Sequence, residues 1–377
     1  MTNWPWINFE INLQKLPWHS WVKLGECVAK CEQIKTVPLK PEVRNQLHLI
    51  YLAKGVQATT AIEGNTLSEE QVKDLVDKKL ELPPSKEYLK TEVQNIIDAC
   101  NEIAVDISSG KFNKISAAWL CQFNKKILQN VPVAEDVQPG QIRTHAVVVG
   151  NLYRAPDAKD VSALVEKFCD WMNSSCLRNE QMPVHFAIIK AVAAHLYIAW
   201  IHPFGDGNGR VARLLEFAIL LGSGIPSPAA HLLSNHYNVT RTEYYRQLDK
   251  AGKTNDPTEF FCYAIQGFLD GLEEQLKYIR EHIIDVCWRE FIYQRFQEVV
   301  GKKVMRRRRK LALQISGQKD PINREHLLTL MEKDYRNSER TLSRDLNELE
   351  KMKLIIRDGR SYIANKDLIL QLLPFST

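Results

Sequence analysis

Cysteine is scarce in this sequence, and several motifs that would mark other kinds of protein are missing. Eight of the 377 residues are cysteine, and none forms a C-x-x-C pair. This excludes a disulfide scaffold and the usual zinc and thioredoxin signatures, so we expect reduced, mostly buried thiols. No H-E-x-x-H pair is present, and Gln247 stands where a P-loop ending in Gly252-Lys253-Thr254 needs its first glycine.

The chain also lacks a recognisable signal peptide and a long hydrophobic run. Its first residues, MTNWPWINFEINLQ, contain no basic stretch followed by an apolar one. The most apolar stretch, residues 186–201, is shorter than the ~20 residues that span a bilayer, and it contains Lys190 and His195. We expect a buried helix there, with His195 as a hydrogen-bonded core residue, in a cytoplasmic protein without a membrane partner.

Positive charge is concentrated near the C-terminus. The chain has a net charge of +5, but residues 301–365 hold 17 Lys or Arg against 9 Asp or Glu. This segment therefore carries +8 and the remainder −3. A basic segment on a mildly acidic body indicates an anionic partner such as nucleic acid, with the run Arg306–Arg309 as candidate phosphate contacts.

Helical periodicity dominates the first three quarters of the chain. Val43, Leu47 and Ile50 recur at i, i+4 and i+7, which predicts an amphipathic helix over residues 41–56. Residues 141–149, QIRTHAVVV, are rich in β-branched side chains and lie between turn residues, which predicts a short extended hairpin or flap. Further helices are expected over residues 89–108, 115–129, 161–173, 184–200, 209–221, 241–251 and 258–280.

The pattern changes near the C-terminus. Helices are expected over residues 303–315, 323–331 and 338–353, with Asn323 capping the second and Asn337 or Ser338 the third. Two short strands, 354–357 and 361–364, are joined through Asp358-Gly359, a strong hairpin signal. This order is that of a winged helix. The expected domains are a leader over residues 1–40, a body over 41–285 and a winged-helix domain over 286–377.

The most informative stretch is HPFGDGNGRVAR, residues 202–213. Its glycine-rich turn at Gly207, Asn208 and Gly209 can aim several backbone N–H groups at one point. The helix that follows adds its positive N-terminal end, and together they make an anion site.

Charged side chains of the same stretch complete a set suited to phosphate chemistry. Arg210 and Arg213 share a helix face and can hold phosphate groups through their forked donors. Asp206 offers the oxygen ligands that Mg²⁺ prefers. His202 can take a proton from a hydroxyl near neutral pH.

These residues match the complete Fic motif, H-x-F-x-[D/E]-G-N-G-R-x-x-R, and the chain resembles Fic proteins over about residues 40–280. The resemblance implies a mainly α fold, a helical bundle with a short β-hairpin flap, to which this chain adds the winged-helix domain. It also implies a protein adenylyltransferase, which moves AMP from ATP to a Ser, Thr or Tyr hydroxyl of a protein.

The resemblance assigns a role to each matching residue. His202 is the general base, Asp206 holds Mg²⁺ on the α- and β-phosphates, and Arg213 grips the γ-phosphate. Tyr244 contacts adenine, although Ala251 and Gly252 stand where some relatives carry an asparagine, which leaves the nucleotide preference open. The implied ATP-binding residues are Val147, Val148, Val149 and Gly150 of the flap, with Asp206, Gly207, Asn208, Gly209, Arg210, Arg213 and Tyr244.

A second match lies upstream, near residues 55–65. The stretch TTAIEGN, residues 59–65, resembles the inhibitory motif [S/T]-x-x-x-E-[G/N] of self-restrained Fic proteins. Thr59 and Glu63 are four apart and share a helix face. By the resemblance, Glu63 pairs with Arg213 and takes the place of the γ-phosphate.

Several alternatives stay open at this point. The chain could be a DNA-binding regulator whose body senses nucleotide, or an enzyme that uses UTP or a phosphocholine nucleotide. The winged helix could bind DNA, dock the protein target or form a homodimer contact. The target protein, self-modification and the balance between adding and removing AMP are not decided by the sequence.

Overall fold

The chain folds into two compact units. In the computed structural model, residues 4–39, 41–76, 80, 82–149, 153–297, 303–318, 320–336 and 338–371 are described. The contacts divide the chain into Met1–Leu276 and Lys277–Thr377. The division falls inside one long helix, α12 (Thr258–Gln297), rather than at the boundary expected after residue 285.

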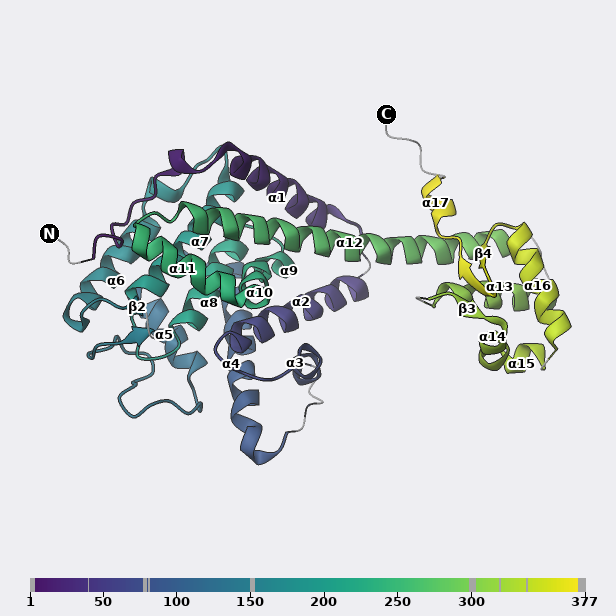
Figure 1. Ribbon diagram of the computed structural model, residues 1–377, viewed down its shortest axis with the longest axis horizontal. Helices are drawn as coiled ribbons and strands as arrows, with labels where there is room; N and C mark the ends of the chain where they lie inside the picture. The colour runs from purple at the N-terminus through teal and green to yellow at the C-terminus, as the bar shows by residue number, and fades with distance from the viewer. Residues whose placement is uncertain are drawn as a thin grey trace. The chain divides into compact units, whose positions relative to one another are not determined.

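The first unit is a bundle of helices (Figure 1). All eight helices expected over residues 41–280 are present, and α12 runs beyond its expected end to Gln297, where Trp288, Ile292 and Phe296 are buried in the core of the second unit. The helices are α1 (Trp18–Thr36), α2 (Pro41–Ala61), α3 (Glu69–Val76), α4 (Glu87–Ser108), α5 (Ala117–Ile127), α6 (Ala158–Asn173), α7 (Pro183–Ile201), α8 (Asn208–Gly222), α9 (Ser227–Ala230), α10 (Leu232–Val239), α11 (Arg241–Thr254) and α12.

Four of these helices were not expected from the sequence: α1, α3, α9 and α10. In α1 the buried face includes Leu24, Cys27, Cys31 and Ile34, so two cysteines serve as core residues of the helix. Helices α9 and α10 are only four and eight residues long, too short for a clear periodic signal.

Helices α7 and α8 pack against each other at the centre of the first unit. Among the described residues, α7 is the one helix long and apolar enough to cross a membrane, but most of it is buried inside the protein, as expected for a core helix. Helix α8 also contacts α2, α4 and α5. The turn between α7 and α8, residues 202–207, therefore lies where several helices can supply side chains.

The predicted flap is shorter as a β-hairpin than the sequence suggested. Strand β1 (Val148–Val149) pairs antiparallel with β2 (Tyr153–Arg154), while residues 141–147 are outside the strand. The buried Arg143 side chain binds the carbonyls of His202, His145 and Pro156 and ties this segment to the body. Gly150, predicted to line the nucleotide, lies outside the described residues.

The second unit has its own core and the element order expected for a winged helix. Its three-stranded sheet has the order β3-β5-β4, so a short strand not expected from the sequence joins the hairpin. The elements after α12 are α13 (Lys303–Ser316), β3 (Ile322–Asn323), α14 (Arg324–Leu330), α15 (Glu332–Tyr335), α16 (Glu339–Lys351), β4 (Ile355–Asp358), β5 (Ser361–Ala364) and α17 (Asp367–Gln371).

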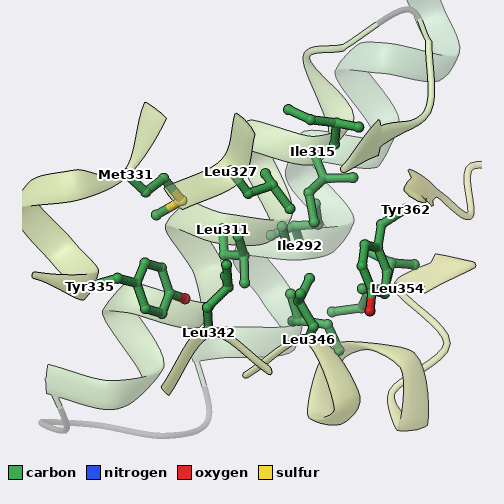
Figure 2. Packing of buried hydrophobic residues seen from close by; sticks show 14 of the residues in the cluster. Ile292, Leu311, Ile315, Leu327, Met331, Tyr335, Leu342, Leu346, Leu354 and Tyr362 are labelled. Atoms are coloured by element: carbon green, nitrogen blue, oxygen red, sulfur yellow. The ribbon is translucent and has the colours of Figure 1, made fainter. Parts of the chain in front are cut away.

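Apolar side chains from these elements meet in one cluster (Figure 2). Leu311 and Ile315 of α13 lie beside Leu346 of α16 and Tyr362 of β5, all at most 1% exposed. Asn323 caps α14 as expected, accepting a hydrogen bond from the backbone N–H of His326 at 2.9 Å. The Ser338 side chain does not cap α16; its hydroxyl is 2.9 Å from that of Thr341, and Asn337 lies outside the described residues.

Two of the four arginines in the run pair with a buried carboxylate inside the second unit. Arg307 and Arg308 donate from Nε to the two oxygens of Asp345, at 2.7 and 2.8 Å, and Asp345 is fully buried in α16. Tyr335 donates to the same carboxylate at 3.1 Å. The expectation that the whole run contacts phosphates is therefore wrong for Arg307 and Arg308, because a buried carboxylate needs their charge.

Replacing Asp345 should destabilise the second unit. Asp345→Ala leaves two guanidinium groups without their counter-charge and is expected to lower the local free energy of unfolding by about 3 kcal/mol. Hydrogen exchange of the α16 amides in the full chain measures this loss. Glu348→Ala, which removes a more exposed carboxylate 3.6 Å from Arg308, should cost less than about 1 kcal/mol. Equal effects of the two substitutions would contradict the assignment.

Candidate active site

The site is organised around an ion pair between Glu63 and Arg213. Arg213 Nη2 donates to Glu63 Oε1 at 2.6 Å and to the backbone carbonyl of Thr59 at 2.9 Å. The Arg213 side chain is 1% exposed and that of Glu63 29%. Burial alone would raise the pKa of Glu63, but the charge and hydrogen bond of Arg213 outweigh it and lower that pKa. The same pairing raises the pKa of Arg213, so both groups are held charged.

The Glu63 carboxylate lies at the N-terminus of α8. A Cβ atom on Gly209 would be 2.3 Å from Glu63 Oε1, so only glycine leaves room for the carboxylate there. Gly209 belongs to the first turn of α8, whose backbone N–H groups lack intrahelical acceptors and carry partial positive charge. The carboxylate thus occupies the position that the sequence predicts for a phosphate group.

His202 ends α7 in a left-handed conformation, with φ of 50°. Its Nδ1 is 3.3 Å from the backbone oxygen of Ala199, which can only accept, so in the neutral ring Nδ1 carries the proton and Nε2 keeps its lone pair. Burial lowers the pKa of His202 to about 4, against the opposing effects of the Ala199 carbonyl, Glu63 and Asp206. The ring is therefore neutral at pH 7, as a general base requires.

Buried residues hold the turn between α7 and α8 in shape. Phe204 is 1% exposed, and Asn208 binds both the N–H and the C=O of Phe204 at 2.8 Å. Gly207 has φ of 80°, a conformation that favours glycine. Asn124 of α5 donates to the Asp206 carbonyl at 2.8 Å and accepts from the Gly140 N–H at 2.8 Å, which joins this turn to the start of the flap segment.

Asp206 and Arg210 lie together, as their spacing predicts. Arg210 Nη2 donates to Asp206 Oδ1 at 2.8 Å, and Arg210 Nη1 donates to Glu92 of α4 at 2.5 Å. Asp206 Oδ1 also accepts from the Gly207 N–H. Within the described part of the chain, Oδ2 has no recorded donor, and the Asp206 side chain is 40% exposed. Asp206 therefore offers one carboxylate oxygen toward solvent.

The predicted adenine contact, Tyr244, is turned into the core. It is 3% exposed, and its hydroxyl is 2.8 Å from Nε2 of His195, which is a hydrogen-bonded core histidine as expected. His195 Nδ1 lies 3.1 Å from Glu216, so the ring connects Tyr244 to a buried carboxylate. The neighbouring Tyr245 is 44% exposed, with the Arg241 guanidinium 6.0 Å from the centre of its ring.

The flap valines lie along the short hairpin. The carbonyl of Val147 accepts from the Ala155 N–H at 3.3 Å, and the Val148 side chain is 60% exposed. Val149 pairs with Tyr153 in the hairpin.

Sequence reasoning missed three side chains that hold the site: Glu92, Asn124 and Arg143. Each is buried, and each contacts a residue of the motif or the flap segment. One signal could have found Glu92, because it interrupts an apolar helix face between Leu89 and Ile96. Arg143 lies within a segment that reads as a strand, and nothing in its local pattern marks it as a tether.

The depressed pKa of His202 can be tested by NMR. In ¹⁵N-labelled protein the His202 signals should show a neutral ring from pH 8 down to about pH 5, with protonation only near pH 4. Glu63 favours the charged ring, so Glu63→Gly should lower this pKa further. The His202→Gln variant assigns the signals, and a midpoint near 6.5 would contradict the burial argument.

The chain is similar to known proteins in sequence and in fold. The sequence profile of the Fic/DOC family matches residues 114–220. The chain is 31% identical over 196 residues to protein adenylyltransferase fic-1 of Caenorhabditis elegans, and 27% identical over 195 residues to protein adenylyltransferase Fic of Nematostella vectensis. These matches cover 52% and 51% of this chain, but only 36% and 42% of the relatives, so the chain spans less than half of their length.

Solved structures share the fold. A Fic family protein from Desulfovibrio desulfuricans G20 superposes with a TM-score of 0.55 at 21% identity, covering 91% of this chain and 95% of that one. A fragment of Fic-1 from C. elegans gives a TM-score of 0.57 at 24% identity, covering 70% of this chain and 74% of that one. The chain therefore carries a Fic/DOC-family domain, matched over residues 114–220.

Proposed function

We propose that this protein is a protein adenylyltransferase that Glu63 restrains. The observation that carries the proposal is the Glu63 carboxylate at the N-terminus of α8, 2.6 Å from Arg213 and in the same site as His202. A carboxylate held there supports the prediction of an anion site. The names of the curated relatives supply the reaction class.

The reaction is an in-line displacement at phosphorus. The target hydroxyl loses its proton to His202 Nε2, its oxygen bonds to the α-phosphorus of ATP, and the bond to the β-phosphate bridging oxygen breaks to release pyrophosphate. The free N–H groups at the start of α8 stabilise charge on the phosphates. His202 is neutral before the reaction, so it can accept the proton at physiological pH.

The residues present fit a magnesium ion bound together with the nucleotide. Asp206 has an outward carboxylate oxygen, and Mg²⁺ prefers one or two carboxylates together with phosphate oxygens and water. No group of three or more His, Cys, Asp or Glu gathers into a metal site in the described residues. We therefore infer that Asp206 is the protein ligand, and the metal when bound would neutralise phosphate charge.

Inhibition follows from the position of Glu63. Arg213 Nη1 and Nε are buried without a recorded partner in the described part of the chain, so the guanidinium has donors to spare. A γ-phosphate that bound this guanidinium would compete with Glu63, because both are anions at one cation. We infer that ATP enters the productive pose when the Glu63 segment moves away, and that exposed Tyr245 rather than Tyr244 stacks on adenine.

Removing the Glu63 carboxylate should release the activity. Glu63→Gly is expected to raise AMP transfer from labelled ATP and Mg²⁺ to protein by about 10- to 100-fold, the range of one charged hydrogen bond. Adding His202→Ala to that variant should lower transfer by about 10²- to 10⁴-fold through loss of the general base. Intact-mass analysis identifies the added AMP, on this chain or on a target from a lysate.

The test has clear opposing outcomes. Equal AMP transfer with and without the His202→Ala substitution would contradict the role of His202 as general base. If UTP or a phosphocholine nucleotide is used as the donor in competition with ATP, the site assignment stands and the proposed donor is wrong.

The partner of the second unit is proposed to be duplex DNA. After Arg307 and Arg308 are assigned to Asp345, Arg340 and Arg344 of α16 remain exposed on one helix face, and Arg357 and Arg360 flank the turn between β4 and β5. A helix that presents cations beside a basic hairpin tip fits the major groove and the adjacent backbone.

Salt dependence tests this partner. Duplex affinity should fall steeply with salt. If the Arg340 side chain contacts a phosphate, Arg340→Ala should make the plot of log affinity against log salt concentration less steep by about 1. Lys351→Ala, at the far end of α16, should leave the slope unchanged. Failure to bind any duplex at low salt would exclude DNA and favour a protein partner for this surface.

A further inference from the structure

One buried carboxylate contacts both the inhibitory segment and the motif. Glu92 lies on α4 and is 7% exposed. Its Oε1 accepts from Arg210 Nη1 at 2.5 Å, and its Oε2 accepts from Asn65 Nδ2 at 2.9 Å. Asn65 follows Glu63 by two residues. Arg210 lies in the first turn of α8, where the sequence predicts the anion site. Glu92 therefore joins two segments that are far apart in the sequence.

Asn65 is the fixed point of the turn that carries Glu63. Its side-chain amide donates to the Leu89 carbonyl at 3.0 Å as well as to Glu92, and its amide oxygen accepts from the Leu67 N–H at 3.0 Å. Its own N–H donates to the Thr60 carbonyl at 3.1 Å. Both amide hydrogens are thus used, and the turn after α2 is attached to α4.

Glu92 also binds Arg210, through the carboxylate oxygen that does not bind Asn65. The two Nη atoms of Arg210 are committed to carboxylates, Nη1 to Glu92 and Nη2 to Asp206. The Arg210 side chain is 5% exposed, and through Nη2 it orients Asp206. An apolar residue in place of Glu92 would leave Arg210 Nη1 and one amide hydrogen of Asn65 without an acceptor.

We propose that Glu92 is a positioning residue with two roles: through Asn65 it strengthens inhibition by Glu63, and through Arg210 it orients Asp206 for the nucleotide. The first role stabilises the restrained state, and the second serves the active state. Glu92 does not touch substrate. The proposal rests on the proposed adenylyltransferase function, and it predicts that the two roles can be separated by mutation.

The first role is tested with Asn65→Ala in two backgrounds. With Glu63 present, Asn65→Ala should raise AMP transfer about tenfold, as expected for losing one hydrogen bond to a charged group that holds the inhibitory turn. In the Glu63→Gly background it should change transfer less than twofold, because no carboxylate remains to be positioned. A merely destabilising substitution would lower transfer in both backgrounds.

The second role is tested with Glu92→Gln in the Glu63→Gly background. A glutamine has one amide oxygen and one NH₂ group. Either Arg210 or Asn65 would therefore face a donor instead of an acceptor. We expect KM for ATP with Mg²⁺ to rise about tenfold with a smaller change in kcat, because Asp206 already binds the metal–nucleotide complex before the chemical step. Asn95→Ala, which removes bonds from α4 to the Ile127 and Gln129 carbonyls instead, is the matched control and should leave KM unchanged.

Hydrogen exchange separates this proposal from the proposed function. Without nucleotide, Asn65→Ala and Glu92→Gln should both speed exchange of the amides of residues 63–67, and Asn95→Ala should not. If these amides open faster but Glu63→Gly transfers no AMP, the attachment is supported and the adenylyltransferase assignment fails. Unchanged exchange, or an equal effect of Asn65→Ala in both backgrounds, would overturn the first role. An unchanged KM in Glu92→Gln would overturn the second.

Discussion

A buried guanidinium needs an anion, and the rest of the site follows from that requirement for Arg213. Its side chain is 1% exposed, and Glu63 supplies the negative charge at 2.6 Å. The start of α8 adds partial positive charge from free N–H groups, so the same place attracts either a carboxylate or a phosphate. Under the proposed function, restraint by Glu63 and the productive pose of ATP are thus alternatives at one cation. The proposed inhibition needs no separate regulatory site.

The helices around α8 are held together by polar side chains as well as by apolar packing. Glu92 of α4, Asn124 of α5 and Arg143 of the flap segment each bind a motif or flap group from a buried position. A buried polar group without a partner costs free energy, so each contact restricts how its helix can lie. Such restrictions give His202 and Asp206 fixed positions. Loss of one of these contacts is therefore expected to disturb several parts of the site.

The second unit shows how burial changes the meaning of charge. Four consecutive arginines indicate a phosphate-binding surface when the sequence is read alone, but two of them neutralise the fully buried Asp345. Exposed cations remain on α13, α14 and α16 and beside the β4–β5 turn. Net charge therefore overstates the part of the basic segment that is available to a partner. Only exposed charges contribute to salt-dependent binding.

The sequence by itself determined eight helices of the first unit, the hairpin at Asp358-Gly359 and the motif at residues 202–213, because each depends on residues within a few positions of one another. It also predicted the Glu63–Arg213 pair, through the Fic resemblance. Tertiary structure alone decided the roles of Glu92 and Asn124, the inward turn of Tyr244 and the short flap. Those features depend on partners brought together by folding: Glu92 and Arg210 are 118 positions apart, and Asn124 and Asp206 are 82 apart. Local periodicity carries no information on such distant contacts.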